Sequence, residues 1–296
     1  MPGSSRRLWS AMNLGGLTFH EAAVRTWTKI NDDAILTRAA AITFYAFAAL
    51  VPFLGLFLAL TAHWLPWIEL RLAGERASEL SQPLDDLLPP DAASFITHEL
   101  RHLRDAPSSG WLPFGLVALL WLSSSVFVEI IDAMNYILGV KDRRSFYKRR
   151  GIAFVMTISQ AAILVVAVIT TVAWPQILSL LNVRGSTAIL ATISHQITVF
   201  VTVLLSFALA LYVAPDVEQR WEWITPGSLL GTIVLLAFSL VFRVYTQHWG
   251  NYNATYGSLA GIIVFLSWLW LSSVFLLTAA ELNKVIKDAS PLGKSE

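Results

Sequence analysis

The sequence has no cysteine and few charged residues. Without cysteine, disulfides, thiolate metal sites and cysteine nucleophiles are all excluded. Only 14% of the 296 residues are charged, whereas roughly a quarter are charged in a typical soluble domain. Hydrophobic residues make up 55% of the chain, and its mean hydropathy is +0.60. These values predict a protein that resides in a lipid bilayer.

Two sequence signals are also missing. The basic N-terminus is not followed by an apolar core of about 7 to 15 residues with a cleavage site, as a signal peptide would be. We therefore expect the first apolar run to remain in the protein. The pattern G-x-x-x-x-G-K-[ST] does not occur, so active transport would need an ion gradient or a partner that binds ATP.

Six stretches are long and apolar enough to cross a bilayer, which takes about 20 helical residues for a hydrocarbon layer of ~30 Å. They lie near residues 39–62, 111–138, 152–174, 188–213, 227–247 and 257–280. Pro52 falls inside the first stretch, where neighbouring helices can compensate for a kink. The sequence thus predicts an all-α integral membrane protein with six transmembrane helices.

Lysine and arginine predict the orientation, because cytoplasmic segments carry an excess of these residues. They are concentrated before the first span, between spans two and three, and after the last span. These segments lie on one side, so both termini are expected in the cytoplasm. The expected organisation is an N-terminal segment (1–36), a membrane domain (37–283) and a tail (284–296).

The stretch KDRRSFYKRR between spans two and three contains six cations. We interpret it as a cytoplasmic anchor, since each cation near an anionic leaflet contributes about 1 kcal/mol of attraction. Binding of nucleic acid is the less favoured interpretation. The anchor residues are Lys141, Arg143, Arg144, Lys148, Arg149 and Arg150.

Two segments outside the spans have helical patterns. Residues 14–36 place Phe19, Ala23, Trp27 and Ile30 on one stripe, as expected of a helix on the inner interface. The outer loop, 65–110, contains a second amphipathic pattern that begins after Asp91, a suitable N-cap. Neither segment is long enough to form a second domain.

Three stretches carry a family resemblance: DDAILTRAAAITFYAFAALVPFL at 32–54, NYILGVKDRRSFYKRR at 135–150 and YGSLAGIIVFLSWLWLSSVFLLTAAELN at 256–283. Together they resemble the YihY/BrkB family of bacterial inner-membrane proteins, which are similar to the UPF0761 group and were once labelled ribonuclease BN. Some members carry a virulence-factor name. The resemblance implies six spans and an inner-membrane location, but it supplies no catalytic residues.

Enzyme chemistry has little support in the sequence. A nuclease needs clustered metal ligands or a facing acid and base, and the cytoplasmic acids and histidines are scattered. The stretch HELRH in the outer loop matches the zinc motif H-E-x-x-H through His98, Glu99 and His102. No third ligand follows at a recognised spacing, so a zinc hydrolase or a nuclease ranks third among the functions considered, and no cofactor is expected.

Ionisable residues inside the spans are a better indication of function, because a central aspartate costs about 2.5 to 3.5 kcal/mol on insertion scales. Glu129, Asp132 and Asn135 share one helix face at i, i+3 and i+6. Either they line a water-filled path, or the two acids pair with cations such as Arg38 or Arg150 and lock the bundle. Glu281 and Asn283 end the last span similarly, which suggests one inner vestibule.

The fifth and sixth spans both contain G-x-x-x-G, at Gly227/Gly231 and Gly257/Gly261. The surrounding segments, 227–236 and 257–266, agree at most positions and would run in opposite directions. Such an echo is typical of inverted-repeat transporters, but close helix packing through the small residues is the simpler interpretation.

The favoured function is movement of a small polar or anionic solute, or a lipid, across the bacterial inner membrane. The expected polar path contains Glu129, Asp132, Asn135, Glu281, Asn283 and Arg38. The alternative is a non-transporting envelope scaffold or interaction protein. Expected partners are anionic membrane lipids and the solute, with a homo-oligomer left open and no nucleic acid.

Overall fold

The computed structural model describes residues 14–50, 120–180, 187–217, 224–249 and 260–290. Within these ranges the regular structure is entirely helical and contains no strand. The elements are η1 (Leu14–Gly16), α2 (Phe19–Asp32), α3 (Ile35–Ala48), α9 (Ser125–Ile137), α10 (Phe146–Leu180), α11 (Thr187–Val213), α12 (Pro226–Trp249) and α14 (Ala260–Ala289). The predicted all-α class is confirmed for the described residues.

Four of the described helices are long and apolar enough to cross a membrane. The qualifying segments are Phe146–Ala167, Gln196–Val213, Pro226–Tyr245 and Gly261–Ala289. They correspond to the predicted third to sixth spans. Of the predicted first and second spans, the structure describes parts as the shorter helices α3 and α9, while the outer loop 65–110 lies outside the described residues.

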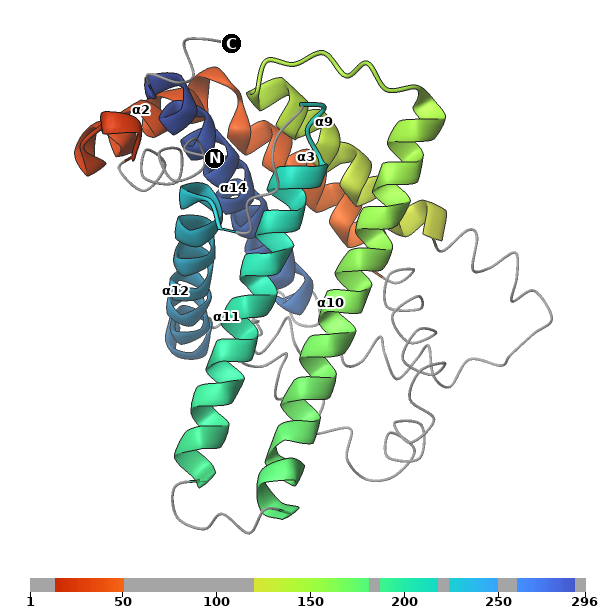
Figure 1. Cartoon of the computed structure of the whole chain (residues 1–296), viewed down its shortest axis with the longest axis vertical. Coiled ribbons are helices and arrows are strands. Elements are labelled where there is room, and N and C mark those ends of the chain that lie inside the picture. Colours follow the sequence, from red (N-terminus) through yellow and green to blue (C-terminus); the bar gives the residue numbers. More distant parts are fainter. Residues whose placement is uncertain (1–13, 51–119, 181–186, 218–223, 250–259, 291–296) are drawn as a thin grey trace, which may run out of the picture.

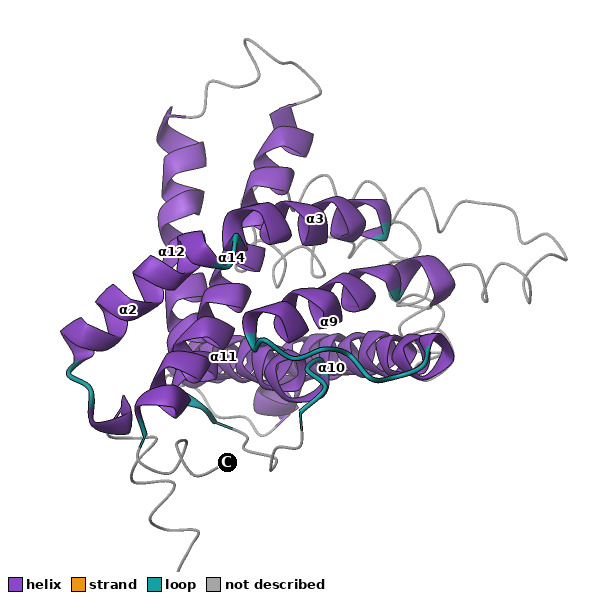
Figure 2. Cartoon of the chain, turned by 90° about the horizontal axis from the view of Figure 1, so that it is seen from above, coloured by secondary structure: helices purple, strands orange, loops and turns teal. Residues whose placement is uncertain are grey.

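Helix α14 lies at the centre of the described bundle. It packs against α12, α3, α2 and α9, and the long helices α10 and α11 run side by side (Figure 1). Seen from above, α3 and α9 lie next to each other, and α2 extends away from the bundle (Figure 2). Helices from both ends of the chain thus surround α14.

Helix α2 begins at a capping box. The Thr18 hydroxyl accepts a 3.2 Å hydrogen bond from the Glu21 backbone N–H, and the Glu21 carboxylate accepts one of 2.9 Å from the Thr18 backbone N–H. These bonds satisfy two donors that a helix start leaves unpaired. The N–H of Thr18 also lowers the pKa of Glu21 below its ordinary value.

The two faces of α2 have different surroundings. Ala22 and Thr26 are buried, whereas Phe19 is 65% exposed and Trp27 is 70% exposed. The helix therefore buries small side chains and leaves its large aromatic side chains mostly exposed. An exposed aromatic stripe of this kind is typical of a helix at a membrane surface.

A sharp corner separates α2 from α3. Ala34 adopts the left-handed conformation with φ 49°, which costs a non-glycine residue about 1–2 kcal/mol. The Asp33 N–H donates to the Lys29 carbonyl at 2.9 Å and ends α2. The sequence pattern predicted one helix over 14–36. The structure instead divides this segment and places Asp33 at the corner.

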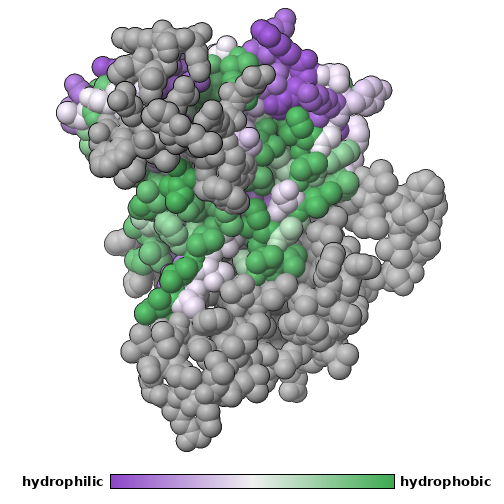
Figure 3. Space-filling view, in the orientation of Figure 1, coloured by the Kyte–Doolittle hydropathy of each residue, from purple (hydrophilic) through white to green (hydrophobic). Residues whose placement is uncertain are grey.

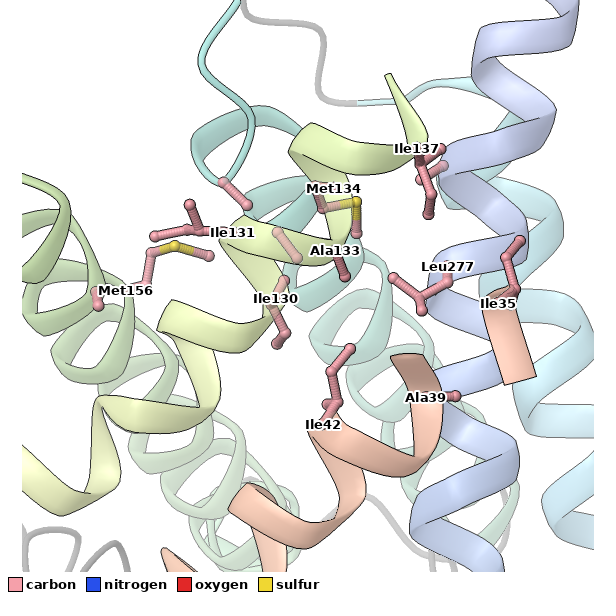
Figure 4. Packing of buried hydrophobic residues seen from close by; sticks show 14 residues of the cluster. Ile35, Ala39, Ile42, Ile130, Ile131, Ala133, Met134, Ile137, Met156 and Leu277 are labelled. Carbon is pink, nitrogen blue, oxygen red and sulfur yellow. The ribbon is translucent and has the colours of Figure 1, made fainter. Parts of the chain in front are cut away.

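The buried core joins α3, α9, α10, α11 and α14. Ile131, Met134, Met156 and Leu277 are among its least exposed members (Figure 4). Between membrane helices the gain comes from close packing rather than from expulsion of water, because lipid tails are as apolar as leucine. The core fixes how α9 and α3 lie on α14.

The outer faces of the long helices are apolar. Val155 and Val166 on α10 and Leu240 and Val241 on α12 are each at least 60% exposed. In Figure 3 apolar residues cover the middle of the visible face, and hydrophilic residues gather at one end. Large exposed apolar surface is unfavourable in water, so these faces suit contact with lipid.

Candidate functional site

The most deeply buried charged side chain of the described residues belongs to Glu281 on α14. It has 0% exposure, and neither carboxylate oxygen has a hydrogen-bond partner. Its nearest ion-pair partner is Lys284, whose Nζ lies 3.9 Å from Oε1. This distance allows electrostatic attraction but no hydrogen bond.

Lys284 also approaches the corner between α2 and α3. Its Nζ lies 3.6 Å from Oδ2 of Asp33 and donates a 2.5 Å hydrogen bond to the Ile137 carbonyl at the end of α9. Asp33 Oδ2 is buried and has no hydrogen-bond donor. We call Asp33, Glu281 and Lys284 the Glu281 cluster. It joins the α2–α3 corner, α9 and α14.

The Glu281 cluster contains two carboxylates and one ammonium group. With all three ionised, its net charge is −1 at a place from which water is largely excluded. A buried charge without a partner is costly, and proteins normally pair or neutralise it. The cluster can therefore accept one further positive charge, which is an uncommon property inside a helix bundle.

Arg38 braces the same corner. Its Nε donates to the Asp33 carbonyl at 3.3 Å, and its guanidinium lies 3.4 Å from the centroid of the Tyr136 ring. The latter geometry is a cation–π contact. Glu129 is half-buried on α9, where its charge interacts with those of Asp132 and Arg38.

Asp132 pairs with Arg149, at 2.6 Å. The sequence suggested Arg38 or Arg150 as the cations that lock this region. Arg149 and Arg150 are successive residues of α10, which begins at Phe146. Their side chains therefore point about 100° apart, and only that of Arg149 reaches Asp132. Arg150 consequently points to a different neighbour.

Arg150 is buried against the start of the α9 region. Its guanidinium lies 3.9 Å from the Trp121 ring centroid, and it donates to Ser125 Oγ at 3.2 Å and to the Trp121 carbonyl. The centroid of the Phe154 ring lies 5.5 Å from the same guanidinium. This cation thus binds α10 to the segment before α9.

Asn135 is a connection between distant parts of the chain. Its Nδ2 donates to Asp142 at 3.2 Å, and its Oδ1 accepts from the Asp216 backbone N–H at 2.7 Å. Only 4% of Asn135 is exposed. Its hydrogen-bonding capacity is used within the protein.

Arg144 completes this connection. It donates to Asp216 Oδ1 at 2.9 Å, to the Ala214 carbonyl at 3.1 Å and to the Pro215 carbonyl at 2.5 Å. The Arg143 N–H donates to Asp216 Oδ2 at 2.8 Å. That N–H, followed by the Arg144 side chain, lowers the pKa of Asp216.

The six cations of the predicted anchor thus fall into two groups. Arg144, Arg149 and Arg150 have the protein partners given above. The second group consists of the exposed residues Lys141, Arg143 and Lys148.

Asn283 caps the start of α12. Its Oδ1 accepts from the Gly227 N–H at 2.8 Å, and its Nδ2 donates to Thr225 Oγ1 at 3.0 Å. A helix start leaves such N–H groups without partners. Asn283 is therefore engaged in joining α14 to α12.

Glycines allow α12 to approach its neighbours. A Cβ on Gly227 would overlap the Ala279 carbonyl, and one on Gly231 would lie 2.6 Å from the Phe207 ring. These contacts are close packing of the kind that small residues permit. Gly261 lies in α14, and Gly257 lies outside the described residues.

The predicted zinc motif and the apolar cavity offer less support for a functional site than the Glu281 cluster does. His98, Glu99 and His102 lie outside the described residues, and the described ranges hold no group of three metal-binding side chains. A cavity of about 270 Å³ lies between α2, α12 and α14. Its walls are mostly apolar, with Trp27, Leu230 and Phe275 among them, and offer a polar solute few partners.

Asp33 and Lys284 were absent from the predicted path. Lys284 follows Glu281 at i+3, a spacing that brings side chains together on a helix. The last span was predicted to end at residue 280, so Lys284 was not expected to lie on the same helix. In the structure α14 continues to Ala289. No local sequence pattern indicated that Asp33 approaches Glu281, because the position of Asp33 depends on the corner at Ala34.

Comparison with known proteins agrees with this architecture. The family described as "Virulence factor BrkB" matches residues 26–295. The chain is 29% identical to the ribonuclease-like protein YfkH of Bacillus subtilis, over 86% of this chain and 91% of that protein. It is 23% identical to a UPF0761 membrane protein of Tolumonas auensis, over 95% and 90% of the two chains.

A UPF0761 membrane protein of Alkalilimnicola ehrlichii is 26% identical, over 88% of this chain and 57% of that protein. No solved structure is a significant match. The family match covers most of the chain and agrees with its apolar helices and with the resemblance of its motifs. The chain belongs to the YihY/BrkB (UPF0761) family of bacterial membrane proteins.

Proposed function

We propose that this protein is an inner-membrane carrier that moves a small polar or anionic solute. The observation that carries the proposal is the Glu281 cluster, in which a fully buried carboxylate without a hydrogen bond lies on a membrane-length helix. Ionisable groups within membrane-spanning helices are costly and commonly mark the path of a solute or ion.

Two other polar residues of the region differ from Glu281 because their side chains have hydrogen-bond partners. Asn135 and Asn283 have partners for their side-chain amides, as expected of structural connections. A purely structural role at Glu281 would be served as well by an apolar side chain, because buried ion pairs give little net stability. The unsatisfied carboxylate therefore favours a functional role.

The proposed topology has six spans, both termini in the cytoplasm and α2 on the inner interface. It is supported by the contact of η1 with the end of α14, since a Cβ on Gly15 would overlap the Ile286 carbonyl. Both ends of the described chain thus lie together. The exposed cations Lys141, Arg143 and Lys148 would attract anionic lipids and raise the local concentration of an anionic solute.

The test compares small molecules inside and outside cells that lack the protein, produce it or produce a variant. Glu281→Gln keeps the shape of the side chain and removes its charge, and Asn31→Ala on the exposed face of α2 is the matched control. We expect one solute class to shift with the native protein and the control, but not with Glu281→Gln.

Equal protein levels in membranes must accompany the comparison, because a misfolded variant would also lose flux. Native flux in correctly inserted Glu281→Gln would contradict the proposed role of the cluster. A complete lack of solute differences would favour the non-transporting scaffold.

A further inference from the structure

We propose that the Glu281 cluster binds one exchangeable proton, shared between Asp33 and Glu281, and that this proton is the coupling ion of the carrier. The coupling rests on the proposed function, whereas the proton site stands on geometry alone. One proton added to a carboxylate gives a neutral carboxylic acid, and its release to water restores the carboxylate.

The carboxylates of the cluster lack hydrogen-bond donors. Three buried oxygens, Oδ2 of Asp33 and both oxygens of Glu281, have no donor. Both carboxylates approach the same Lys284 Nζ, at 3.6 Å for Asp33 and 3.9 Å for Glu281, yet two ionised carboxylates can only accept hydrogen bonds. A proton on either one creates an O–H that can donate to the other.

The cluster also has one negative charge more than it has positive charges. The groups that face Glu281 are Lys284 on its own helix and Asp33 and Lys29 from the α2 side. Lys29 is drawn to Asp32, at 3.5 Å. Arg38 of α3 is directed at a carbonyl and a ring, and of the α9 acids Glu129 and Asp132 the latter pairs with Arg149 at 2.6 Å. One proton removes the cluster's excess negative charge.

The surroundings of the cluster suit a proton better than a metal ion. A bound cation such as Ca²⁺ takes about 6 to 8 oxygen ligands, but the position between the two carboxylates is already approached by the Lys284 ammonium. That group would repel a second cation. The described residues also hold no group of three acidic or histidine side chains suited to a metal.

The corner gives this proton a connection to the rest of the bundle. Lys284 contacts Asp33, Glu281 and the Ile137 carbonyl, so its position depends on which carboxylate is ionised. When Glu281 is neutral, Lys284 is attracted mainly to Asp33. When the proton leaves, both carboxylates attract it. Protonation therefore changes the electrostatic attraction between α14 and the α2–α3 corner.

The test is infrared spectroscopy of the purified protein in liposomes. A protonated carboxylic acid has a C=O stretch that carboxylates lack, and this band shifts when H₂O is replaced by D₂O. We expect such a band in the native protein at neutral pH and its loss at alkaline pH. Glu281→Gln should lose it, and the matched control Glu129→Gln should keep it.

Asp33→Asn provides a second variant, which keeps one acid and should move the pH at which the band disappears. Solute flux is measured in the same liposomes. A titrating band without flux supports the proton site and contradicts transport. Flux without a carboxylic acid band at any pH where the protein is folded would overturn the proton site and leave the carrier intact.

Discussion

Asn135 on α9 accepts a 2.7 Å hydrogen bond from the backbone N–H of Asp216, which follows α11. The same amide donates to Asp142 in the loop between α9 and α10. A single buried side chain thus holds two polar loops at the end of the bundle.

Replacing Asn135 by leucine should destabilise the protein. The change removes both bonds and leaves the Asp216 N–H without its partner, which costs about 1–3 kcal/mol of unfolding free energy. The measurement is the thermal unfolding midpoint in one detergent. Asn31→Leu on the exposed face of α2 serves as the control and should leave the midpoint unchanged. Equal midpoints for the two variants would contradict the role of Asn135.

Asp216 should make stability depend on acid pH. Its pKa is lowered by the Arg143 N–H and the Arg144 side chain, so the folded state favours the carboxylate. This contribution is fully present above the unfolded value of about 3.9 and is lost as pH falls through the lower folded pKa.

The check is to compare unfolding midpoints of the native protein and Asp216→Asn as pH is lowered. We expect the native protein to be more stable at neutral pH, with the difference shrinking in strong acid. A difference that stays constant throughout, or widens with acid, would refute this prediction.

Gly227→Ala should disrupt the contact of α12 with α14. The added Cβ would overlap the Ala279 carbonyl and lie 2.7 Å from the Asn283 side chain. Backbone cannot move aside easily, so we expect a loss of about 1–3 kcal/mol. Gly151→Ala is the matched control, because its Cβ meets nothing within 4 Å. In a helix this control should be neutral or stabilising by up to about 1 kcal/mol. The measurement is the thermal unfolding midpoint of both variants, which should be lowered only in Gly227→Ala.

Arg150→Lys should weaken the attachment of α10. A lysine cannot lie flat on the Trp121 ring while it also donates to Ser125 and the Trp121 carbonyl. We expect a cost of about 1–2 kcal/mol, since the cation–π contact is partly desolvated. Lys148→Arg, at an exposed position nearby, should have no effect. Native stability of Arg150→Lys would show that charge alone suffices there.

The apolar runs and the family motifs were sufficient to predict an all-helical membrane protein of this family. Polar residues in such runs are costly, so Glu281 could be singled out from the sequence. The division of KDRRSFYKRR into exposed and engaged cations could not be predicted. On a helix, one residue is about 100° of rotation, and the partners of Arg149 and Arg150 depend on how α10 lies against α9.

The sequence by itself determined that long apolar helices form, because apolar length is a local property, but it did not indicate the break at Ala34 between α2 and α3. Only the tertiary structure decided which polar groups are satisfied. Asn135 and Asn283 find their partners in Asp216 and Thr225, residues far along the chain. Asp33 joins Glu281 through a corner that no local pattern predicts. A hydrogen bond requires two groups within about 3 Å, and that proximity is a property of the packed bundle.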